Sequence, residues 1–418
     1  MGINALPVRG TKDYLPAEVL LRDYVQGIIL DTYKKFGFQR INTPIMEDIE
    51  RLNKSDGGEN LSMIFKILKR GQKLDLSKEN LVEDDLVDSG LRYDLTMPLS
   101  RYFANNRQNL TLPFKCIQID KVFRAERPQK GRLREFFQCD IDIIGDASAN
   151  AEAELIYVTT QALLNIGFED FTVRVNDRRI LTDLIKSAGF SDEDVPSVCI
   201  SFDKLDKVGL DGVKAELLEK EYVPAVVEKF MEIIGGNDLS DLSAIEKFCS
   251  DAMVPANLKK VIETIRALTG GKFNIVYDKS LVRGMGYYTG MVFEIVSTKF
   301  GSSVAGGGRY DKMIGKFLGE TVPAVGFSIG FERICEILKD SETVKVPQGK
   351  KIVLVYADSD DFGAVLKKTA ELRADGWTVN MLKRSKKLGK QLDAMVDNGY
   401  SHSFNFGEST EPKELQKK

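Results

Sequence analysis

The chain has 418 residues, of which 43% are hydrophobic and 29% are charged, as in globular proteins with more than one domain. Lys and Arg (59) nearly balance Asp and Glu (62), so the net charge of −3 excludes attraction to nucleic acid by overall charge, and any RNA contact must be local. Since no apolar run resembles a signal peptide or a membrane span, we expect a soluble cytoplasmic protein.

The first predicted element is a helix that opens at Leu15 and Pro16 and stops at Gly37, because apolar residues repeat at intervals of four between them. The segment 38–44 then alternates like a strand. Pro44 confines this strand to a sheet edge or a strand end, because proline cannot donate a backbone hydrogen bond. Such an edge suits a subunit interface.

The next segment, 66–89, is polar and highly charged, and it predicts an exposed hairpin or loop before a strand-like stretch at 91–95. Two long strands follow at 114–123 and 135–144, joined by a charged turn. We expect these two strands to pair in an antiparallel sheet.

Helical periodicity dominates from about residue 178 to 270, and strand-like patterning returns from 273 to 330. Because the first architecture resumes, we interpret residues 1–343 as one domain that contains a helical insertion at about 178–270. Residues 344–351 resemble a linker. From 352 to 418, strands and helices alternate, which predicts a small α/β domain.

Cysteine and histidine usage limits the chemistry. The five cysteines are widely spaced and form no C-x-x-C pair, which argues against disulfides or a zinc site and favours small buried thiols. His402 is the only histidine, which nearly excludes histidine-based catalysis and multi-histidine metal sites. We therefore predict no protein-bound metal, and carboxylates, arginines and tyrosines remain as candidate functional groups.

The most informative segment is 122–138, in which several arginines flank a tight turn between the two long strands. This arrangement can hold guanidinium groups around a polyphosphate, so a nucleotide or an RNA end is the natural partner. The alternative, a solvated charged hairpin, does not explain why Gln138, Asp140 and Asp142 alternate with the apolar Ile141 and Ile143.

This segment resembles motif 2 of class II aminoacyl-tRNA synthetases, in the form found in histidyl enzymes. Five other segments agree: 9–13 resembles the N-terminal signature of that family, 91–98 its R-Y-D-L-T-x-P element, 281–294 and 305–311 its two histidine-specific motifs, and 324–333 class II motif 3. The resemblance covers about residues 7–407. It implies an α+β fold with an antiparallel class II catalytic domain, its helical insertion, and a C-terminal α/β anticodon-binding domain.

The resemblance also implies an activity, which is that of a histidine–tRNA ligase. Such an enzyme activates L-histidine with ATP to histidyl-adenylate and pyrophosphate, and then transfers histidine to the 3′ end of tRNA(His). Charge develops on phosphate oxygens, so the main catalytic need is preorganised cations. The implied cofactors are ATP, as substrate, and Mg²⁺, and the implied assembly is a homodimer with its interface near Pro44.

By resemblance, two arginines act on the α-phosphate, Arg124 of motif 2 and Arg283 of the first histidine-specific motif. Arg333 of motif 3 faces the γ-phosphate, while Glu126 and Arg132 help to place ATP and its magnesium. The alternative for any of these arginines is a surface ion pair.

The histidine pocket implied by the family uses polar groups at both ends of the substrate. Asp142 and Tyr288 bind the ring nitrogens, Asp94, Thr96 and Gln138 bind the α-amino group, and Tyr287 and Tyr310 form walls. The full histidine-binding set is Asp94, Leu95, Thr96, Arg124, Gln138, Asp142, Arg283, Tyr287, Tyr288 and Tyr310. For the tyrosines, core packing is the alternative. Glycines 306–308 either let backbone approach a ligand or form a turn.

The chain departs from the family pattern at two places. Met285 and Gly286 stand where an acidic residue is usual, so the orientation of Arg283 is open. The chain also stops soon after Gly407, so we expect the terminal domain to lack a last strand that longer relatives have, and its binding of the anticodon to differ. A basic cluster at 383–390 is either a phosphate-contacting patch or a solvated helix entry.

Three other functions were weighed against this one. A class I synthetase is excluded, because its H-I-G-H element needs two histidines. A synthetase-like regulatory subunit of ATP phosphoribosyltransferase usually loses the terminal domain and the phosphate-binding arginines, whereas this chain keeps both. A pure RNA-binding module fits poorly with the acidic balance.

Overall fold

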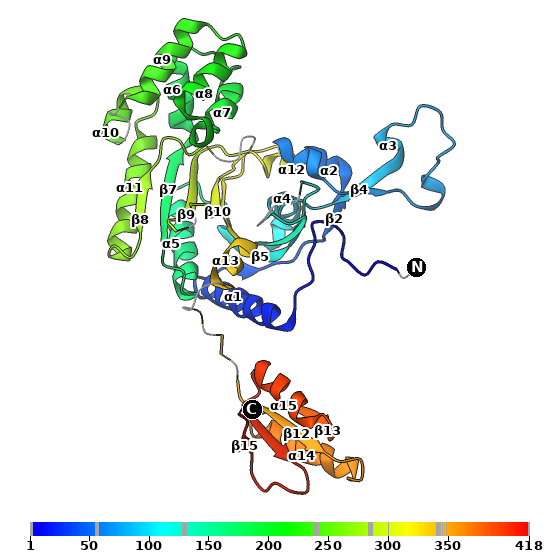
Figure 1. Cartoon of the computed structure of the whole chain (residues 1–418). Coiled ribbons are helices and arrows are strands. Elements are labelled where there is room, and N and C mark those ends of the chain that lie inside the picture. The colour runs from blue at the N-terminus through cyan, green and yellow to red at the C-terminus, as the bar shows by residue number, and fades with distance from the viewer. Residues whose placement is uncertain are drawn as a thin grey trace. The chain divides into compact units, whose positions relative to one another are not determined.

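The computed structural model describes residues 3–54, 58–127, 132–236, 242–282, 287–299, 301–339, 344, 346–347 and 349–416. The chain divides into two compact units, one formed by Met1–Tyr14 with Arg22–Val344 and the other by Leu15–Leu21 with Lys345–Lys418. Figure 1 shows the elements of both units. The three-part domain division expected from the sequence, with a catalytic domain, its insertion and an anticodon-binding domain, stays a prediction.

An eight-stranded sheet forms the centre of the large unit. In spatial order its strands are β1 (Gln39–Arg40), β5 (Phe114–Phe123), β6 (Glu135–Ile144), β11 (Ala324–Gly330), β10 (Ser303–Arg309), β9 (Met291–Ser297), β7 (Phe171–Asp177) and β8 (Asn274–Tyr277). All neighbours are antiparallel except the outer pairs β1 with β5 and β7 with β8. The predicted long strands and the edge position of the strand before Pro44 are confirmed.

Helices cover one face of this sheet (Figure 1). These are α1 (Pro16–Lys35), α5 (Ala149–Asn165) and α13 (Phe331–Lys339); α5 and α13 pack against β6 and β11, and Thr32 of α1 accepts a 3.0 Å hydrogen bond from Asn165 of α5. On β6, Cys139, Ile141 and Ile143 are almost fully buried. Because strand residues alternate between faces, the even-numbered residues of β6 point to the opposite face.

A second, three-stranded sheet carries the segment that was expected to be exposed. It consists of β2 (Met46–Asp48), β4 (Val87–Leu91) and β3 (Lys66–Leu68), and the neighbouring short helices are α2 (Ile49–Lys54), η1 (Gly58–Met63), η2 (Gly71–Lys73) and α3 (Glu83–Leu86). The part between β3 and β4 projects from the large unit as an arm (Figure 1), so the expected exposed hairpin is confirmed.

The strand predicted at 91–95 is wrong, because β4 ends at Leu91 and the helix α4 (Thr96–Asn106) follows, continued by η3 (Arg107–Asn109). Tertiary contacts override the local alternation. The buried Arg92 donates hydrogen bonds to the carbonyl oxygens of Thr43 and Lys121, which turns the chain inward. Oδ1 of Asp94 then accepts a 3.2 Å hydrogen bond from the first turn of α4.

The helices predicted between 178 and 270 are confirmed for the described residues. They are α6 (Arg178–Ala188), α7 (Val195–Phe202), α8 (Leu205–Glu219), α9 (Pro224–Gly235), α10 (Leu242–Ile245), η5 (Glu246–Phe248) and α11 (Met253–Thr269). Local signals set these bounds, since Asp177 caps α6 through the backbone N–H of Arg179 and Gly189 ends it at φ 115°. The last helix, α11, packs against α5 and β8 and so continues the layer over the main sheet.

The small unit is an α/β structure in which strands and helices alternate, as the sequence predicts. They are β12 (Lys351–Tyr356), α14 (Phe362–Ala374), β13 (Thr378–Lys383), α15 (Leu388–Asp397), β14 (His402–Asn405) and β15 (Lys413–Glu414). After Gly407, the short strand β15 pairs with β14 in antiparallel orientation, and the expected lack of a last strand of longer relatives stays a prediction. Four of the five cysteines are buried free thiols, while Cys249 is partly exposed. None of the described helices is long and apolar enough to cross a membrane.

Candidate active site

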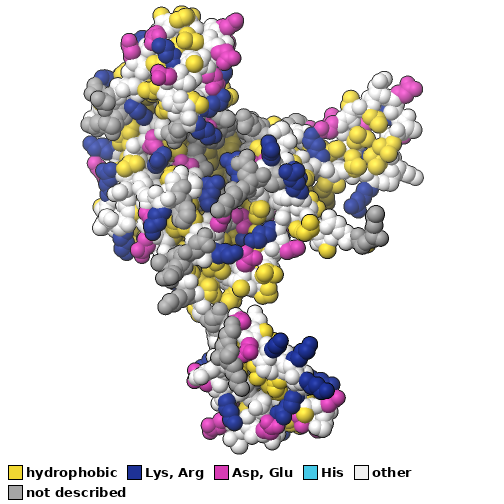
Figure 2. Space-filling view, viewed as in Figure 1, with side chains coloured by type: hydrophobic (Ala, Val, Ile, Leu, Met, Phe, Trp, Pro, Cys, Tyr) yellow, Lys and Arg dark blue, Asp and Glu magenta, His cyan; other side chains and the backbone are white. Residues whose placement is uncertain are grey.

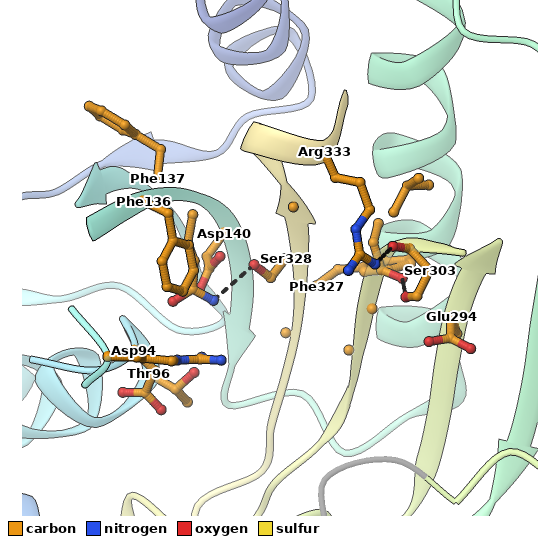
Figure 3. Close-up of a pocket in the computed structure, with 18 of the residues that line it drawn as sticks. Asp94, Thr96, Phe136, Phe137, Asp140, Glu294, Ser303, Phe327, Ser328 and Arg333 are labelled. Atoms are coloured by element: carbon orange, nitrogen blue, oxygen red, sulfur yellow. Dashed lines mark hydrogen bonds between the residues drawn. The ribbon is translucent and has the colours of Figure 1, made fainter. Parts of the chain in front are cut away.

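A cavity of about 720 Å³ lies on the sheet face opposite the helices (Figure 3). Its walls include parts of β6, β9, β10 and β11, the start of α4, the first turn of α13 and Lys207 of α8. The predicted site residues that line it are Asp94, Thr96, Arg124, Glu126, Arg132, Gln138, Asp142, Tyr287, Tyr288, Tyr310 and Arg333. Residues distant in the sequence therefore meet in one cavity.

Two predicted residues fall outside this group. Leu95 is fully buried in the core, and its carbonyl oxygen accepts a 2.9 Å hydrogen bond from Gln118, so its side chain does not line the cavity. Arg283, with Gly284, Met285 and Gly286, lies outside the described residues. Its predicted role at the α-phosphate and the effect of the missing acidic neighbour stay predictions.

Arg124 follows directly after β5 and is fixed in the cavity wall. Its Nε donates a 3.0 Å hydrogen bond to the carbonyl oxygen of Tyr93, and its guanidinium lies 5.2 Å from the ring centroid of Phe136. A guanidinium stacked on an aromatic ring and held at one nitrogen keeps its other N–H groups for an anion. Arg124 is therefore a preorganised cation.

Two further arginines line the same cavity. Arg132 forms a 3.5 Å ion pair with Glu126, and Arg333 donates a hydrogen bond to the carbonyl oxygen of Ser303 on β10. Figure 3 shows Arg333, in the first turn of α13, extending toward Ser303, with Glu294 nearby. Together with Arg124, these side chains give the cavity a set of cations suited to a polyphosphate.

Asp142 occupies the opposite, more enclosed part of the site. The hydroxyl of Tyr310 donates a 2.6 Å hydrogen bond to its Oδ1, and both residues are almost fully buried. On the neighbouring strand β11, a Cβ atom at Gly326 would lie 2.0 Å from the same Oδ1. The position of the Asp142 carboxylate thus depends on a tyrosine beside it and on a glycine opposite it.

Burial shifts the acidity of the carboxyl groups in this cavity. It raises the pKa of Asp142 to about 7, although the Tyr310 hydrogen bond opposes the shift. Burial also raises the pKa of Asp94 to about 6, opposed by the backbone hydrogen bond from Met97 and by the charge of Arg124. For Asp140, burial and the charge of Asp142 hold the pKa well above its ordinary value. The cavity therefore contains three carboxyl groups that bind protons more tightly than usual.

The paired tyrosines stand beside Asp142. The rings of Tyr287 and Tyr288 lie 4.5 Å apart, and the ring of Tyr287 meets that of Tyr310 edge-on at 6.4 Å. All three line the cavity, and Tyr310 is also packed into a core cluster with Leu99 and Phe114. Core packing and a role in the cavity wall thus coexist at Tyr310.

The glycine row on β10 has mainly a packing role. A Cβ atom at Gly307 would lie 2.0 Å from the carbonyl oxygen of Gly326, and one at Gly308 would lie 2.8 Å from that of Met291. The sequence suggested that these glycines either form a turn or let the backbone approach a ligand. Neither alternative includes this close contact between neighbouring strands. Gly306 and Gly307 do line the cavity.

Sequence patterns missed several features of the site. Alternation along β6 placed Asp140 on the correct face, but no signal distinguished it as a cavity residue. Lys207 reaches the cavity from the helical region, which no local pattern could predict. Glu332, which also lines the cavity, binds Arg22 through both carboxylate oxygens, at 2.5 and 2.7 Å, and accepts a 3.0 Å hydrogen bond from Tyr14.

The N-terminal signature segment meets motif 2 through the backbone. The amide of Arg134 donates a 2.7 Å hydrogen bond to the carbonyl oxygen of Gly10, and its guanidinium donates to that of Arg9. The guanidinium also donates to the carbonyl oxygen of Glu126, at 3.1 Å. The segment 9–13 therefore supports the strand end that carries Glu126 and Arg134.

A mainly antiparallel sheet with arginines and carboxylates gathered on its open face defines the class II aminoacyl-tRNA synthetase fold, and the expected α+β architecture is confirmed. A family model of histidyl-tRNA synthetase matches residues 10–334. The chain belongs to the histidyl-tRNA synthetase family.

Relatives of known name agree with this assignment. The chain is 43% identical to a histidine–tRNA ligase of Leifsonia xyli subsp. xyli over 97% of this chain and 96% of that protein. It is 32% identical to one of Cytophaga hutchinsonii over 96% and 92%, respectively.

Solved structures show the same fold. A histidyl-tRNA synthetase from Nostoc sp. PCC 7120 superposes with a TM-score of 0.77 at 29% identity, over 96% of this chain and 91% of that one. A Bacillus halodurans protein described as an ATP phosphoribosyltransferase regulatory subunit/histidyl-tRNA synthetase superposes with a TM-score of 0.78 over 97% and 99%. At 20% identity, this second likeness shows the fold alone.

Proposed function

We propose that the cavity activates L-histidine with ATP and passes the histidyl group to the 3′ end of its tRNA. One observation carries the proposal: a single cavity holds the preorganised Arg124 and, at its enclosed end, the Asp142–Tyr310 pair. A carboxylate oxygen of histidine attacks the α-phosphorus of ATP, and pyrophosphate leaves. A terminal ribose hydroxyl then attacks the carbonyl carbon of the adenylate, and AMP leaves.

The arginines neutralise the charge that develops on phosphate oxygens. Arg124 binds the α-phosphate and the substrate carboxylate, and its fixed guanidinium needs little reorganisation during the reaction. Arg283 takes the same phosphate from the other side, by family resemblance. Arg333 binds the γ-phosphate, and Arg132 with Glu126 positions the nucleotide.

Mg²⁺ accompanies ATP in this proposal. The described residues contain no cluster of three or more His, Cys, Asp or Glu side chains that could hold a metal by themselves. In nucleotide-binding sites, Mg²⁺ is usually coordinated by one or two carboxylates together with phosphate oxygens, so no such cluster is needed. Glu126 and Glu294 line the cavity and are the carboxylates that would hold it. There the ion would neutralise phosphate charge.

The enclosed end of the cavity recognises the imidazole ring. Asp142 accepts a hydrogen bond from one ring nitrogen, and Tyr288 interacts with the other. Because Tyr310 fixes the carboxylate and Gly326 leaves room for it, the acceptor is in place before the substrate arrives. A side chain without a matching N–H would leave Asp142 unpaired, which disfavours other amino acids. Asp94, Thr96 and Gln138 receive the α-amino group.

The small unit is proposed to bind the anticodon stem of tRNA(His). Figure 2 shows several Lys and Arg side chains on its surface. Within the basic cluster, Lys383 pairs with Asp358 and Arg384 with Glu408, both at 2.7 Å. These acidic partners reduce the local charge, so Lys386, Lys387 and Lys390 are the side chains that we expect to contact phosphates.

We also propose that the protein is a cytoplasmic homodimer. Ile45 and Met46, next to Pro44, are 39% and 56% exposed. The arm adds the exposed apolar side chains of Leu68, Leu76 and Val82, and Figure 2 shows hydrophobic side chains gathered there. Exposed apolar groups of this kind suit a protein interface.

Amino-acid-dependent exchange of pyrophosphate into ATP tests the activation step. We expect exchange with histidine alone among the twenty amino acids, and an Arg124→Ala variant that still binds histidine should lose it. Exchange with a different amino acid, or none with any, would refute the proposal. If no amino acid supports exchange but the protein still binds histidine, a regulatory, histidine-sensing protein would be favoured instead.

A further inference from the structure

Asp140 is a buried carboxylate in the cavity wall with little compensation. It is 5% exposed, and its Oδ1 has no hydrogen-bond partner among the described residues. Oε1 of Gln138, two residues earlier on the same face of β6, is likewise buried without a partner. Buried polar atoms in folded proteins are nearly always satisfied, so two neighbouring acceptors of this kind indicate a ligand that supplies donors.

A hydrogen-bond chain fixes which atoms remain open. Nε2 of Gln138 donates to Oγ of Ser328 at 3.2 Å, and the Ser328 hydroxyl in turn donates to the Asp140 carboxylate. Ser328 on β11 is paired with Asp140 on β6, and Figure 3 shows the two side chains in the same part of the cavity. A hydroxyl has one proton. The Ser328 proton is therefore used within this network, and Oε1 of Gln138 and Oδ1 of Asp140 remain as acceptors for the ligand.

The charged groups near Asp140 are mainly carboxylates, which favours the binding of a cation there. Asp94 and Asp142 both lie close enough to raise its pKa, while the described cation that lowers it is Arg124. Arg124 also faces Asp94, so one guanidinium serves two carboxylates. Asp142 already accepts the Tyr310 hydroxyl. Among these three carboxylates, Asp140 is the one with a buried oxygen, Oδ1, that has no hydrogen-bond partner in the described part of the chain.

We propose that Asp140 binds the α-ammonium group of histidine, as a specificity-determining residue beside Asp94 and Gln138. The inference rests on the proposed function, since it assigns one more contact to the same substrate. An ammonium group carries three N–H donors and matches the acceptors Gln138 Oε1, Asp140 and Asp94. Asp140 thereby favours an α-amino acid over imidazole compounds that lack the amine.

The test compares two ligands that differ only in this group, L-histidine and 3-(imidazol-4-yl)propionate. Titration calorimetry gives the dissociation constant of each for the full-length wild type and for Asp140→Asn, which keeps the shape of the side chain and removes its charge. We expect Asp140→Asn to weaken histidine binding by about 10- to 100-fold and binding of the propionate by less than about threefold, because the lost contact is a charge-assisted hydrogen bond.

The result that would overturn the inference is an equal change for the two ligands, or no change for histidine. A merely structural role of Asp140 would weaken both ligands alike. If Asp140→Asn does not fold, the variant Ser328→Ala is measured instead. Loss of the Ser328 hydroxyl disorders the same acceptors, so it should again weaken the binding of histidine more than the binding of the propionate.

Pyrophosphate exchange by the wild type separates this inference from the proposed function. If the wild type catalyses pyrophosphate exchange and Asp140→Asn selectively weakens the binding of histidine, the proposed function and the role of Asp140 are both supported. Unchanged selectivity in an active enzyme refutes only the role of Asp140. A wild type that binds histidine without exchange refutes the proposed function, while the two binding constants still decide the role of Asp140. A wild type that binds no histidine refutes both.

Discussion

The hydroxyl of Tyr310 donates a 2.6 Å hydrogen bond to Oδ1 of Asp142, and the two side chains are 1% and 3% exposed. A hydrogen bond to a carboxylate favours its ionised form, so this contact lowers the pKa that burial has raised to about 7. Tyr310 therefore sets how much of Asp142 is ionised near neutral pH.

The first prediction concerns Tyr310→Phe. Without the hydroxyl, the pKa of Asp142 rises above about 7, and a larger fraction of the residue is protonated at neutral pH. Since the ionised carboxylate accepts the ring N–H, the KM for histidine should fall as pH rises in both proteins. In the variant this fall should occur about one pH unit higher, with a KM about fivefold larger at pH 7. Pyrophosphate exchange from pH 6 to 9 measures both.

Tyr33→Phe is the matched control. Tyr33 is also fully buried, but it lies on α1, away from the residues that line the cavity. Tyr33→Phe should therefore keep the wild-type pH profile. Ionisation of histidine itself affects the wild type and both variants equally, so it cannot cause a difference between their profiles. An unshifted profile in Tyr310→Phe would show that Asp142 is not the titrating acceptor.

The second prediction uses the close approach of β11 to Asp142. A Cβ atom at Gly326 would lie 2.0 Å from Oδ1 of Asp142 and 3.2 Å from the Tyr310 ring, so Gly326→Ala must displace the carboxylate. Because a misplacement of about 1 Å can cost about 100-fold in rate, kcat/KM for histidine should fall at least that far. Gly27→Ala, in α1 with no atom within 4 Å of the added carbon, should retain activity. Wild-type activity in Gly326→Ala would contradict the assigned role of Asp142.

Elements with a strong local pattern could be predicted from the sequence. The helix α1, the strands β5 and β6, and the alternating elements of the small unit follow apolar periodicity bounded by glycine or proline, and both signals are local. The segment 91–95 shows where this reasoning fails. Its alternation resembles a strand, but Arg92 is drawn into the core by Thr43 and Lys121, which are distant in the sequence.

Motifs in the sequence could predict which residues belong to the site. They could not predict how contacts between neighbouring strands position those side chains. Motif resemblance identified Asp142, but its dependence on Gly326 arises from the register between β6 and β11. Asp140 shares the face of Asp142, yet its open acceptor depends on Ser328, which no pattern along β6 contains. Leu95 shows the converse, because a motif position proved to be a core residue.

The third prediction concerns the ion pair between Arg22 and Glu332 in the cavity wall. Glu332 binds Arg22 with both oxygens, and their side chains are only 14% and 11% exposed. Glu332→Gln leaves the Arg22 charge largely unpaired, so the free energy of unfolding should fall by about 2–3 kcal/mol. Urea unfolding measures the loss. Glu320→Gln breaks an exposed ion pair with Arg107 and should leave stability unchanged within error. Equal losses in the two variants would contradict the special position of the buried pair.

The last prediction tests the proposed homodimer at β2. Met46 is 56% exposed beside the edge segment that ends at Pro44, and a charge there must be desolvated if this surface is buried against a second copy. Met46→Asp should therefore weaken the dimer by about 100-fold or more, measured by sedimentation over a range of protein concentrations. Met253→Asp makes the same exchange at a methionine that is 61% exposed at the start of α11, and it should leave the dimer intact. A Met46→Asp variant that sediments as the wild type would place the interface elsewhere, and a wild type that sediments as a monomer would exclude the homodimer itself.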